Sequence, residues 1–272
     1  MPRDRLRAIA AETVAIVEAG GYREPAGSWV DIGAAVAHAV TGTRLYRPDE
    51  PLPRRGDRNP TPLVEVVNES TLVAARRLST EGDDAAGLVF ASARNPGGGF
   101  LTGARAQEED IARASALHAC LATAGGFYEH HRASHDLRYS DRVIYAPRVP
   151  VFRDSLKLLD RPFTLSMLVA AAPNLRAVLS NQPALADTVP AVVRGRAIRV
   201  LEVAAAHGHR RLVLGAWGCG VFGNDPTVVA EAFATALATV NVFDHVVFAV
   251  LDRGPVTTTY DAFADVFGPG RP

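Results

Sequence analysis

The chain has 272 residues, of which 48% are hydrophobic and 21% are charged, so it can bury the core of one or two globular domains. Lysine plus arginine equals aspartate plus glutamate, at 29 each, and the net charge is zero. This balance excludes a protein that holds nucleic acid through a broad basic surface, and an anionic ligand would have to be bound by loops and helix ends.

The cysteines, the N-terminus and the apolar runs indicate a cytoplasmic protein. Cys120 and Cys219 are too few for a disulfide framework and are typical of a reducing compartment, with Cys120 expected in the core. The first residues lack the apolar region of a signal peptide. No run approaches the roughly 18 apolar residues that suggest a membrane span. We therefore expect no membrane contact and no binding of duplex nucleic acid.

The N-terminal part begins with apolar residues at helical spacing over 4–19, and Gly20-Gly21 then ends that helix. A short strand around 29–32 and an alanine-rich piece over 33–40 follow. Several prolines fall within 46–62, and because proline lacks a backbone donor we expect a connector there. The pattern predicts an accessory segment over 1–45, a proline-rich connector over 46–62 and a catalytic core over 63–272.

Strands and helices alternate through this core. Continuous apolar runs predict buried strands, and helical spacing or capping residues predict the helices between them. The expected strands are 63–67, 87–92, 143–152, 163–171, 211–217 and 245–251. One expected helix begins near Ser70 or Thr71, and the others cover 107–124, 190–206 and 226–239. This alternation predicts a layered α/β/α domain whose ligand lies beyond the carboxyl ends of the strands.

Two glycine-rich loops each follow a predicted strand and precede a predicted helix. The first runs from Asn95 through Gly97–Gly99 to Gln107-Glu108-Glu109, and the second is Gly218–Gly223. Glycine allows close backbone approach to a ligand, and successive N–H groups in such loops form a concavity for anions. Each loop alone is more often a tight turn. Together, with paired glutamates after the first, they favour a site for a phosphate-rich ligand.

Other nucleotide-binding motifs fit less well. Neither loop ends in Gly-Lys-Ser/Thr, which excludes a P-loop. The second loop has the glycine spacing of a dinucleotide fingerprint, but a lone match is weak. Asp252 is only a loose candidate for the acidic residue that would bind a ribose.

The combination of Gly97–Gly99 with Gln107-Glu108-Glu109 resembles the signature of poly(ADP-ribose) glycohydrolases. Gly220–Gly223 resembles the second phosphate loop of macrodomains, the fold of those enzymes. The short length and the helical N-terminal extension are similar to the bacterial branch of the family, and the resemblance covers about 60–255. It implies an α/β fold, namely a three-layer α/β/α macrodomain-like mixed sheet with a helical N-terminal extension.

The resemblance also implies a role for each matching residue. Glu109 would be the catalytic acid, and Glu108 would hold a ribose hydroxyl and orient the substrate. Phe222 would pack near the terminal ribose. The residues implied in ligand binding are Asn95, Gly97, Gly98, Gly99 and Gln107 from the first loop, Gly220, Val221, Phe222 and Gly223 from the second, and Glu69 near the adenine.

The implied reaction hydrolyses the ribose–ribose O-glycosidic bonds of poly(ADP-ribose), mainly from chain ends, and releases ADP-ribose without a metal or other cofactor. Its transition state resembles an oxocarbenium ion, and a carboxylic acid can supply the proton that the leaving oxygen needs. Successive helical residues point about 100° apart, so Glu108 and Glu109 have different tasks. Two alternatives stay open: a hydrolase that removes single ADP-ribose units from protein or nucleic acid, and a non-catalytic ADP-ribose-binding module.

Two further features are interpreted as solvated surface. His131 and His135 have the spacing of metal ligands, but the segment 129–136 follows two glycines and lacks a clear helical period. We expect a loop there and no metal. The three arginines of the expected helix 190–206 should lie on its exposed face: Arg194, Arg196 and Arg199.

Overall fold

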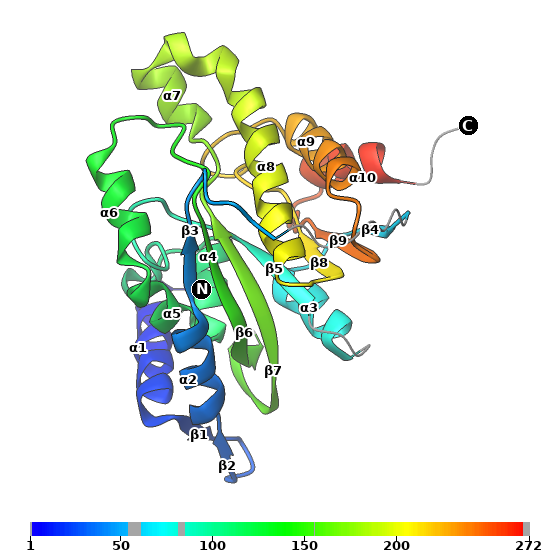
Figure 1. The fold of residues 1–272 in the computed structure, drawn as a ribbon. Coiled ribbons are helices and arrows are strands. Elements are labelled where there is room, and N and C mark those ends of the chain that lie inside the picture. Colours follow the sequence, from blue (N-terminus) through cyan, green and yellow to red (C-terminus); the bar gives the residue numbers. More distant parts are fainter. Residues whose placement is uncertain (1, 54–60, 81–84, 155, 269–272) are drawn as a thin grey trace.

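A seven-stranded mixed sheet forms the centre of the molecule, in the order β3-β6-β7-β5-β8-β9-β4 (Figure 1). The computed structural model describes residues 2–53, 61–80, 85–154 and 156–268. From β7 to β4 neighbouring strands are parallel, whereas β6 and β3 add antiparallel pairs at one edge. The strands of this sheet are β3 (Arg44–Tyr46), β4 (Leu63–Val67), β5 (Ala85–Phe90), β6 (Val143–Asp154), β7 (Lys157–Ala170), β8 (Arg211–Leu214) and β9 (His245–Ala249). A separate hairpin pairs β1 (Gly21–Arg23) with β2 (Trp29–Asp31).

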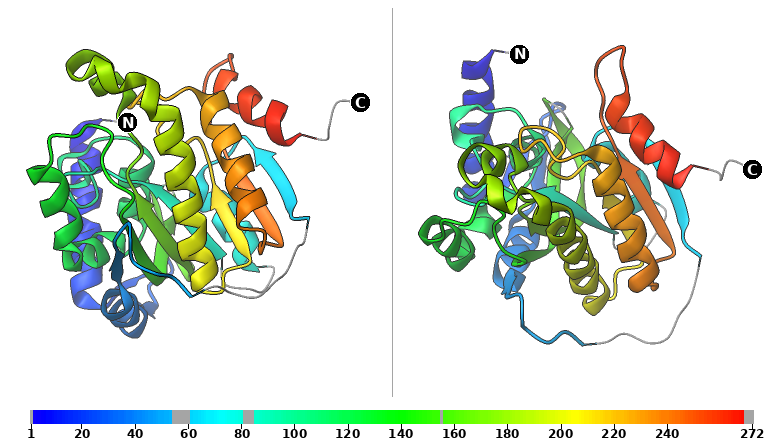
Figure 2. Two further views of the ribbon diagram at one scale, coloured as in Figure 1. Left: turned by 45° about the horizontal axis from the view of Figure 1, so that its top comes forward. Right: turned by 90° about the horizontal axis from the view of Figure 1, so that it is seen from above.

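Helices cover both faces of the sheet (Figure 2). They are α1 (Arg3–Ala19), α2 (Gly33–Gly42), α3 (Thr71–Thr80), α4 (Gln107–Ala114), α5 (Leu117–Thr123), α6 (Gly125–Ala133), α7 (Leu175–Asn181), α8 (Val189–Ala206), α9 (Pro226–Thr239) and α10 (Thr258–Phe267). Successive strand residues face opposite sides, so Leu88 packs in the core under α8 and α9, and Val89 packs in the core under α3, α4 and α5. The predicted three-layer α/β/α arrangement is therefore confirmed.

The N-terminal residues pack directly on the core. Helix α1 ends at Gly20, whose φ is 70°, and its Thr13 hydroxyl donates to the Arg113 carbonyl at 2.7 Å. Residues 44–46, which the sequence analysis divided between segment and connector, form β3 and extend the sheet at its edge. Residues 54–60 of the expected connector lie outside the described residues, so the division at residue 46 stays a prediction.

Two expectations for the middle of the chain are wrong. The expected helix 107–124 is interrupted at Ser115, which is buried and forms an isolated antiparallel bridge with Val151 of β6. At Ser115 the backbone pairs with β6 and does not continue the helix, so α4 and α5 are separate helices. The segment 129–136 is not a solvated loop, because α6 includes most of it and buries His131 at its inner face.

The expectation for the α8 arginines is wrong at two of three positions. Arg194 is exposed, but Arg196 is 1% exposed and Arg199 is also buried. Arg196 donates to the backbone carbonyls of Arg138 and Ala171 at 2.8 and 2.7 Å. It also forms an ion pair with Asp141. A buried charge is tolerated when its donors are satisfied, and the five donors of a guanidinium can satisfy several acceptors at once.

Replacing Arg196 with leucine is expected to lower the free energy of unfolding by about 3 kcal/mol, because two buried carbonyls lose their donor. The matched control is Arg194→Leu on the same helix, whose exposed side chain should change stability by no more than about 0.5 kcal/mol. Urea unfolding of both variants measures the difference. Equal losses for the two variants would contradict the structural role assigned to Arg196.

No helix in the described part of the chain is long and apolar enough to cross a membrane.

Both cysteines are free thiols, and Cys120 is fully buried in the core, as the sequence predicts.

Candidate active site

A cavity of about 930 Å³ opens at the carboxyl ends of the parallel strands. Because these strands share one direction, the segments that follow them meet at the same edge of the sheet. The segments after β4, β5, β8 and β9 contribute Glu69–Leu72, Ala91–Asn95, Ala216–Phe222 and Val250–Arg253 to its walls. The volume is within the range of small-molecule and cofactor sites.

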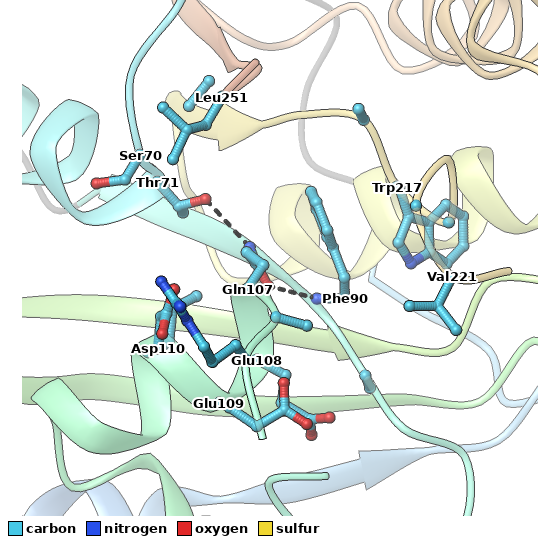
Figure 3. Close-up of a pocket in the computed structure, with 18 of the residues that line it drawn as sticks. Ser70, Thr71, Phe90, Gln107, Glu108, Glu109, Asp110, Trp217, Val221 and Leu251 are labelled. Atoms are coloured by element: carbon cyan, nitrogen blue, oxygen red, sulfur yellow. Dashed lines mark hydrogen bonds between the residues drawn. The ribbon is translucent and has the colours of Figure 1, made fainter. Parts of the chain in front are cut away.

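Gln107 fastens the first turn of α4 to the end of β5. Its Oε1 accepts from the Phe90 N–H at 2.9 Å (Figure 3). Its Nε2 donates to the Leu88 carbonyl at 2.7 Å. The second N–H of the amide donates to the Thr71 hydroxyl at 3.1 Å. Gln107 lines the cavity, but both of its donors are taken by protein acceptors. Its side chain therefore positions the two glutamates that follow, and direct contact with a ligand stays a prediction.

The carboxylates of Glu108 and Glu109 lie close together at the cavity (Figure 3). Glu108 is 3% exposed, and its Oε2 accepts from the Ser92 N–H at 2.6 Å. Glu109 is 8% exposed, and its Oε1 accepts from the Gly99 N–H at 2.8 Å. Within the described residues, Glu108 Oε1 and Glu109 Oε2 are buried without a hydrogen-bond partner. A buried polar atom without a partner needs an explanation, and a substrate hydroxyl at each oxygen supplies one.

Burial raises the pKa of Glu108 to about 8, and the nearby Glu109 carboxylate acts in the same direction. The Ser92 N–H opposes this shift by hydrogen bonding to the anion, and the nearby Gly97 N–H acts in the same direction. Near neutral pH Glu108 therefore carries a proton for much of the time. A protonated carboxyl can donate a hydrogen bond to a ribose hydroxyl, which an anion cannot do.

The raised pKa of Glu108 predicts a pH dependence of stability. Between the ordinary value of 4.5 and about 8, the folded protein binds more protons than the unfolded chain. The stabilising contribution is therefore fully present below 4.5 and is lost as the pH rises toward 8, with a slope of at most about 1.4 kcal/mol per pH unit. Urea unfolding across this window measures the slope. Glu108→Gln removes the titrating group and should flatten this slope. An unchanged slope in that variant would show that another group causes the pH dependence.

The first glycine loop supports the two carboxylates. Gly97 and Gly98 have φ of 69° and 58°, a conformation that L side chains rarely adopt. A Cβ on Gly98 would overlap Glu109 Oε1 and would lie 3.0 Å from Glu108 Oε2. The triple glycine therefore lets the loop backbone approach the catalytic candidates closely. Gly97–Gly99 are not among the described residues that line the cavity, so their contact with a ligand stays a prediction.

The second glycine loop, Gly218–Gly223, contributes another wall. Residues 220–222 line the cavity, and no acceptor in the described part of the chain pairs with their three N–H groups. Such a row of free donors suits a phosphate. The Trp217 indole and the Asn224 amide anchor the two ends of the loop, through hydrogen bonds of 3.0 and 2.9 Å to backbone carbonyls.

Three further candidates take different positions. Asn95 and Glu69 line the cavity, and an oxygen of Glu69 lies 3.6 Å from Arg77 Nη2. Gly223 has a φ of 72° and lies against Arg176, outside the set of residues that line the cavity. The structure thus brings together Glu69, Asn95, Gln107, Glu108, Glu109, Gly220, Val221 and Phe222.

Sequence reasoning did not single out Ser92 or Tyr139, which also line the cavity. Besides its N–H bond to Glu108, Ser92 accepts the Asn95 N–H on its hydroxyl at 3.2 Å. Its place directly after a buried strand was a signal that could have identified it. Tyr139 lies between α6 and β6, where no motif marks it. Asp252 caps α10, because its Oδ2 accepts from the Thr259 and Tyr260 N–H groups.

The described residues contain no group of three or more histidine, cysteine, aspartate or glutamate side chains that could hold a metal ion. The cavity presents the carboxyl groups of Glu108 and Glu109 together with the backbone N–H groups of 220–222.

Comparisons with known proteins identify the family. A family model described as the catalytic domain of microbial-type PARG, or poly(ADP-ribose) glycohydrolase, matches residues 10–154. The crystal structure of poly(ADP-ribose) glycohydrolase from Thermomonospora curvata is 50% identical, with a TM-score of 0.90, over 97% of this chain and 100% of that chain. A comparison with curated proteins found no match.

Two structures of relatives with bound molecules are also similar. The Thermomonospora curvata enzyme bound to the inhibitor ADP-HPD is 49% identical, with a TM-score of 0.88, over 96% of this chain and 98% of that chain. The Deinococcus radiodurans enzyme in complex with ADP-ribose is 44% identical, with a TM-score of 0.80, over 86% of this chain and 97% of that chain. The mixed sheet, its helical layers and the matched residues lead to one conclusion: the chain belongs to the microbial-type poly(ADP-ribose) glycohydrolase family.

Proposed function

We propose that this protein hydrolyses the ribose–ribose O-glycosidic bonds of poly(ADP-ribose), mainly at chain ends, and releases ADP-ribose. Its family membership supports this activity, and similar enzymes have been crystallised with ADP-ribose and with ADP-HPD. One observation carries the proposal. Glu108 and Glu109 each present a buried oxygen without a partner in the described residues, in a cavity that the N–H groups of 220–222 also line.

Binding of one ADP-ribose unit follows from the donors and acceptors of the cavity. The free N–H groups of 220–222 suit the diphosphate, because they supply partial positive charge in a chain with no net charge. Glu69 also lines the cavity and would lie near the adenine in this proposal. Asn95 and the protonated Glu108, which line the same cavity, would hold the hydroxyls of the distal ribose.

Glu109 performs the proton transfers in this proposal. Its carboxyl proton passes to the leaving hydroxyl oxygen as the bond from that oxygen to the ribose C1 breaks. The positive charge that develops on the ribose is stabilised by the bound diphosphate. Glu109, now a carboxylate, accepts a proton from water as the water oxygen bonds to C1. The products are ADP-ribose and a polymer that is one unit shorter.

The Gly99 N–H orients Glu109 for this role, because it occupies Oε1 and leaves Oε2 for the substrate. Glu108 has a different environment. Burial raises its pKa and favours a neutral group that can donate to a hydroxyl, and the Ser92 N–H fixes the position of its Oε2. The two environments therefore support the division of tasks that the helical geometry requires.

Incubation with labelled poly(ADP-ribose) tests the proposed function. We expect release of ADP-ribose and progressive shortening of the chains without long internal fragments. Binding of the polymer without release would instead indicate a non-catalytic module. Release from a singly modified protein, with no action on the polymer, would indicate a mono-ADP-ribosyl hydrolase.

A further inference from the structure

Tyr139 has a backbone conformation that a tyrosine rarely adopts. Among the described residues other than glycine, only Tyr139 and Arg148 have positive φ, at 61° and 45°. Such strain persists where the surrounding structure imposes it, and it is concentrated at ligand sites. Tyr139 lines the active-site cavity, whereas Arg148 lies in an irregular stretch of β6 and is not among the residues that line it.

Buried side chains hold the backbone on both sides of Tyr139. The His131 imidazole accepts the Ser140 N–H at 3.2 Å and pairs with the Ser140 hydroxyl at 2.8 Å. On the other side, Arg196 donates to the Arg138 carbonyl at 2.8 Å. His131 and Arg196 are each 1% exposed. The buried side chains of His131 and Arg196 therefore fix the residues on either side of Tyr139. These hydrogen bonds hold the backbone of Tyr139 in its strained conformation.

The Tyr139 ring connects this anchored segment to the second glycine loop. Its centroid lies 5.7 Å from that of His131 and 6.1 Å from that of Phe222. Both separations are within the range of favourable aromatic pairs. Phe222 also lines the cavity, and its carbonyl accepts the Arg176 N–H at 2.9 Å. The Tyr139 ring is therefore a rigid support against which the Phe222 ring packs.

We infer that Tyr139 is a positioning residue for poly(ADP-ribose) hydrolysis, whose ring holds Phe222 in place at the reacting end of the cavity. This inference rests on the proposed function and on the prediction that Phe222 packs near the terminal ribose. A small displacement of the ribose relative to Glu109 slows the reaction strongly, because the proton donor and the leaving oxygen must stay aligned. The strained backbone brings the ring to this position.

Tyr139→Gly tests the inference directly, because glycine adopts the same φ without strain and removes the side chain with its ring. We expect kcat on poly(ADP-ribose) to fall about tenfold or more, since Phe222 loses its support. KM should change by less than about threefold, because the loop N–H groups that bind the diphosphate remain. Tyr139→Phe keeps the ring and should retain the wild-type kcat. If Tyr139→Gly does not fold, Tyr139→Asn gives the same test, because asparagine also tolerates this conformation.

A double variant with Phe222→Leu distinguishes a positioning role of Tyr139 from a general loss of structure. In a Phe222→Leu background, Tyr139→Gly should lower kcat little further, whereas independent effects would multiply. Arg148→Gly relieves the same kind of strain away from the cavity and should leave kcat and KM unchanged.

Three results would overturn the inference. They are an unchanged kcat in Tyr139→Gly, fully multiplicative effects in the double variant, and failure of Tyr139→Phe to retain activity. Wild-type protein that releases no ADP-ribose would instead refute the proposed function itself, so the two failures are distinguishable.

Discussion

Glutamine in place of Glu109 should lower kcat on poly(ADP-ribose) by roughly 10²–10⁴-fold, the usual contribution of a general acid. The amide has nearly the same size and can still accept the Gly99 N–H, which Glu109 accepts at 2.8 Å. It cannot deliver an acidic proton to the leaving oxygen. Binding of ADP-ribose should stay within a few-fold of wild type, as calorimetric titration would show. Retention of more than about 1% of kcat would contradict the acid role.

Glu108→Gln is the matched control, because it makes the same chemical change at the adjacent carboxyl. Burial raises the pKa of Glu108 to about 8, so a neutral amide resembles the state that this residue already favours near neutral pH. The amide can accept the Ser92 N–H and can donate to a ribose hydroxyl. We therefore expect a loss of about tenfold or less in kcat/KM. If the order of the two losses were reversed, Glu108 would be the acid.

Alanine in place of Gly98 is expected to abolish most activity, with a loss of about 100-fold or more in kcat. The new Cβ would overlap Glu109 Oε1, so the carboxylate must move away from the reacting bond. Because Gly98 has a φ of 58°, the variant should also lose about 1–2 kcal/mol of stability. Steady-state kinetics and urea unfolding measure the two effects separately.

Gly195→Ala serves as the control for Gly98→Ala. Gly195 lies inside α8, and a Cβ built there meets nothing within 4 Å. Alanine should therefore leave kcat unchanged and raise stability by about 0.5–1 kcal/mol, through its better helix propensity. Wild-type kcat in Gly98→Ala would show that the carboxylate does not depend on close approach of this loop.

The positions of the core strands along the chain, and of the glycine loops that follow two of them, could be predicted. Apolar runs and glycine-rich turns are local features of the sequence. The apolar run before Asn95 forms β5, and the glutamates of 107–109 begin α4, as the pattern predicts. Ser115 shows where local reasoning fails. Its neighbours continue the helical spacing of apolar residues, yet the helix breaks there because the backbone pairs with Val151, a residue distant in the chain.

The environment of charged side chains could not be predicted, because elements remote in sequence create it. Arg196 and Arg194 carry the same side chain on one helix, and sequence reasoning assigned both to its exposed face. Only the carbonyls of Arg138 and Ala171 make burial of Arg196 favourable. His131 likewise belongs to a helix whose buried face is aromatic and therefore lacks an obvious aliphatic period. Burial depends on packing partners, which periodicity does not specify.

The sequence by itself determined the layered α/β/α architecture, the two glycine loops, the paired glutamates and the family that they indicate. These features depend on backbone propensities and on residue types at short spacing. Only the tertiary structure decided that Glu108 is deeply desolvated, that Gly98 and Gly99 lie against the Glu109 carboxylate, and that Tyr139 faces Phe222. Each of these depends on contacts between segments far apart in the chain, and such contacts exist only once the sheet has brought the loops to one edge.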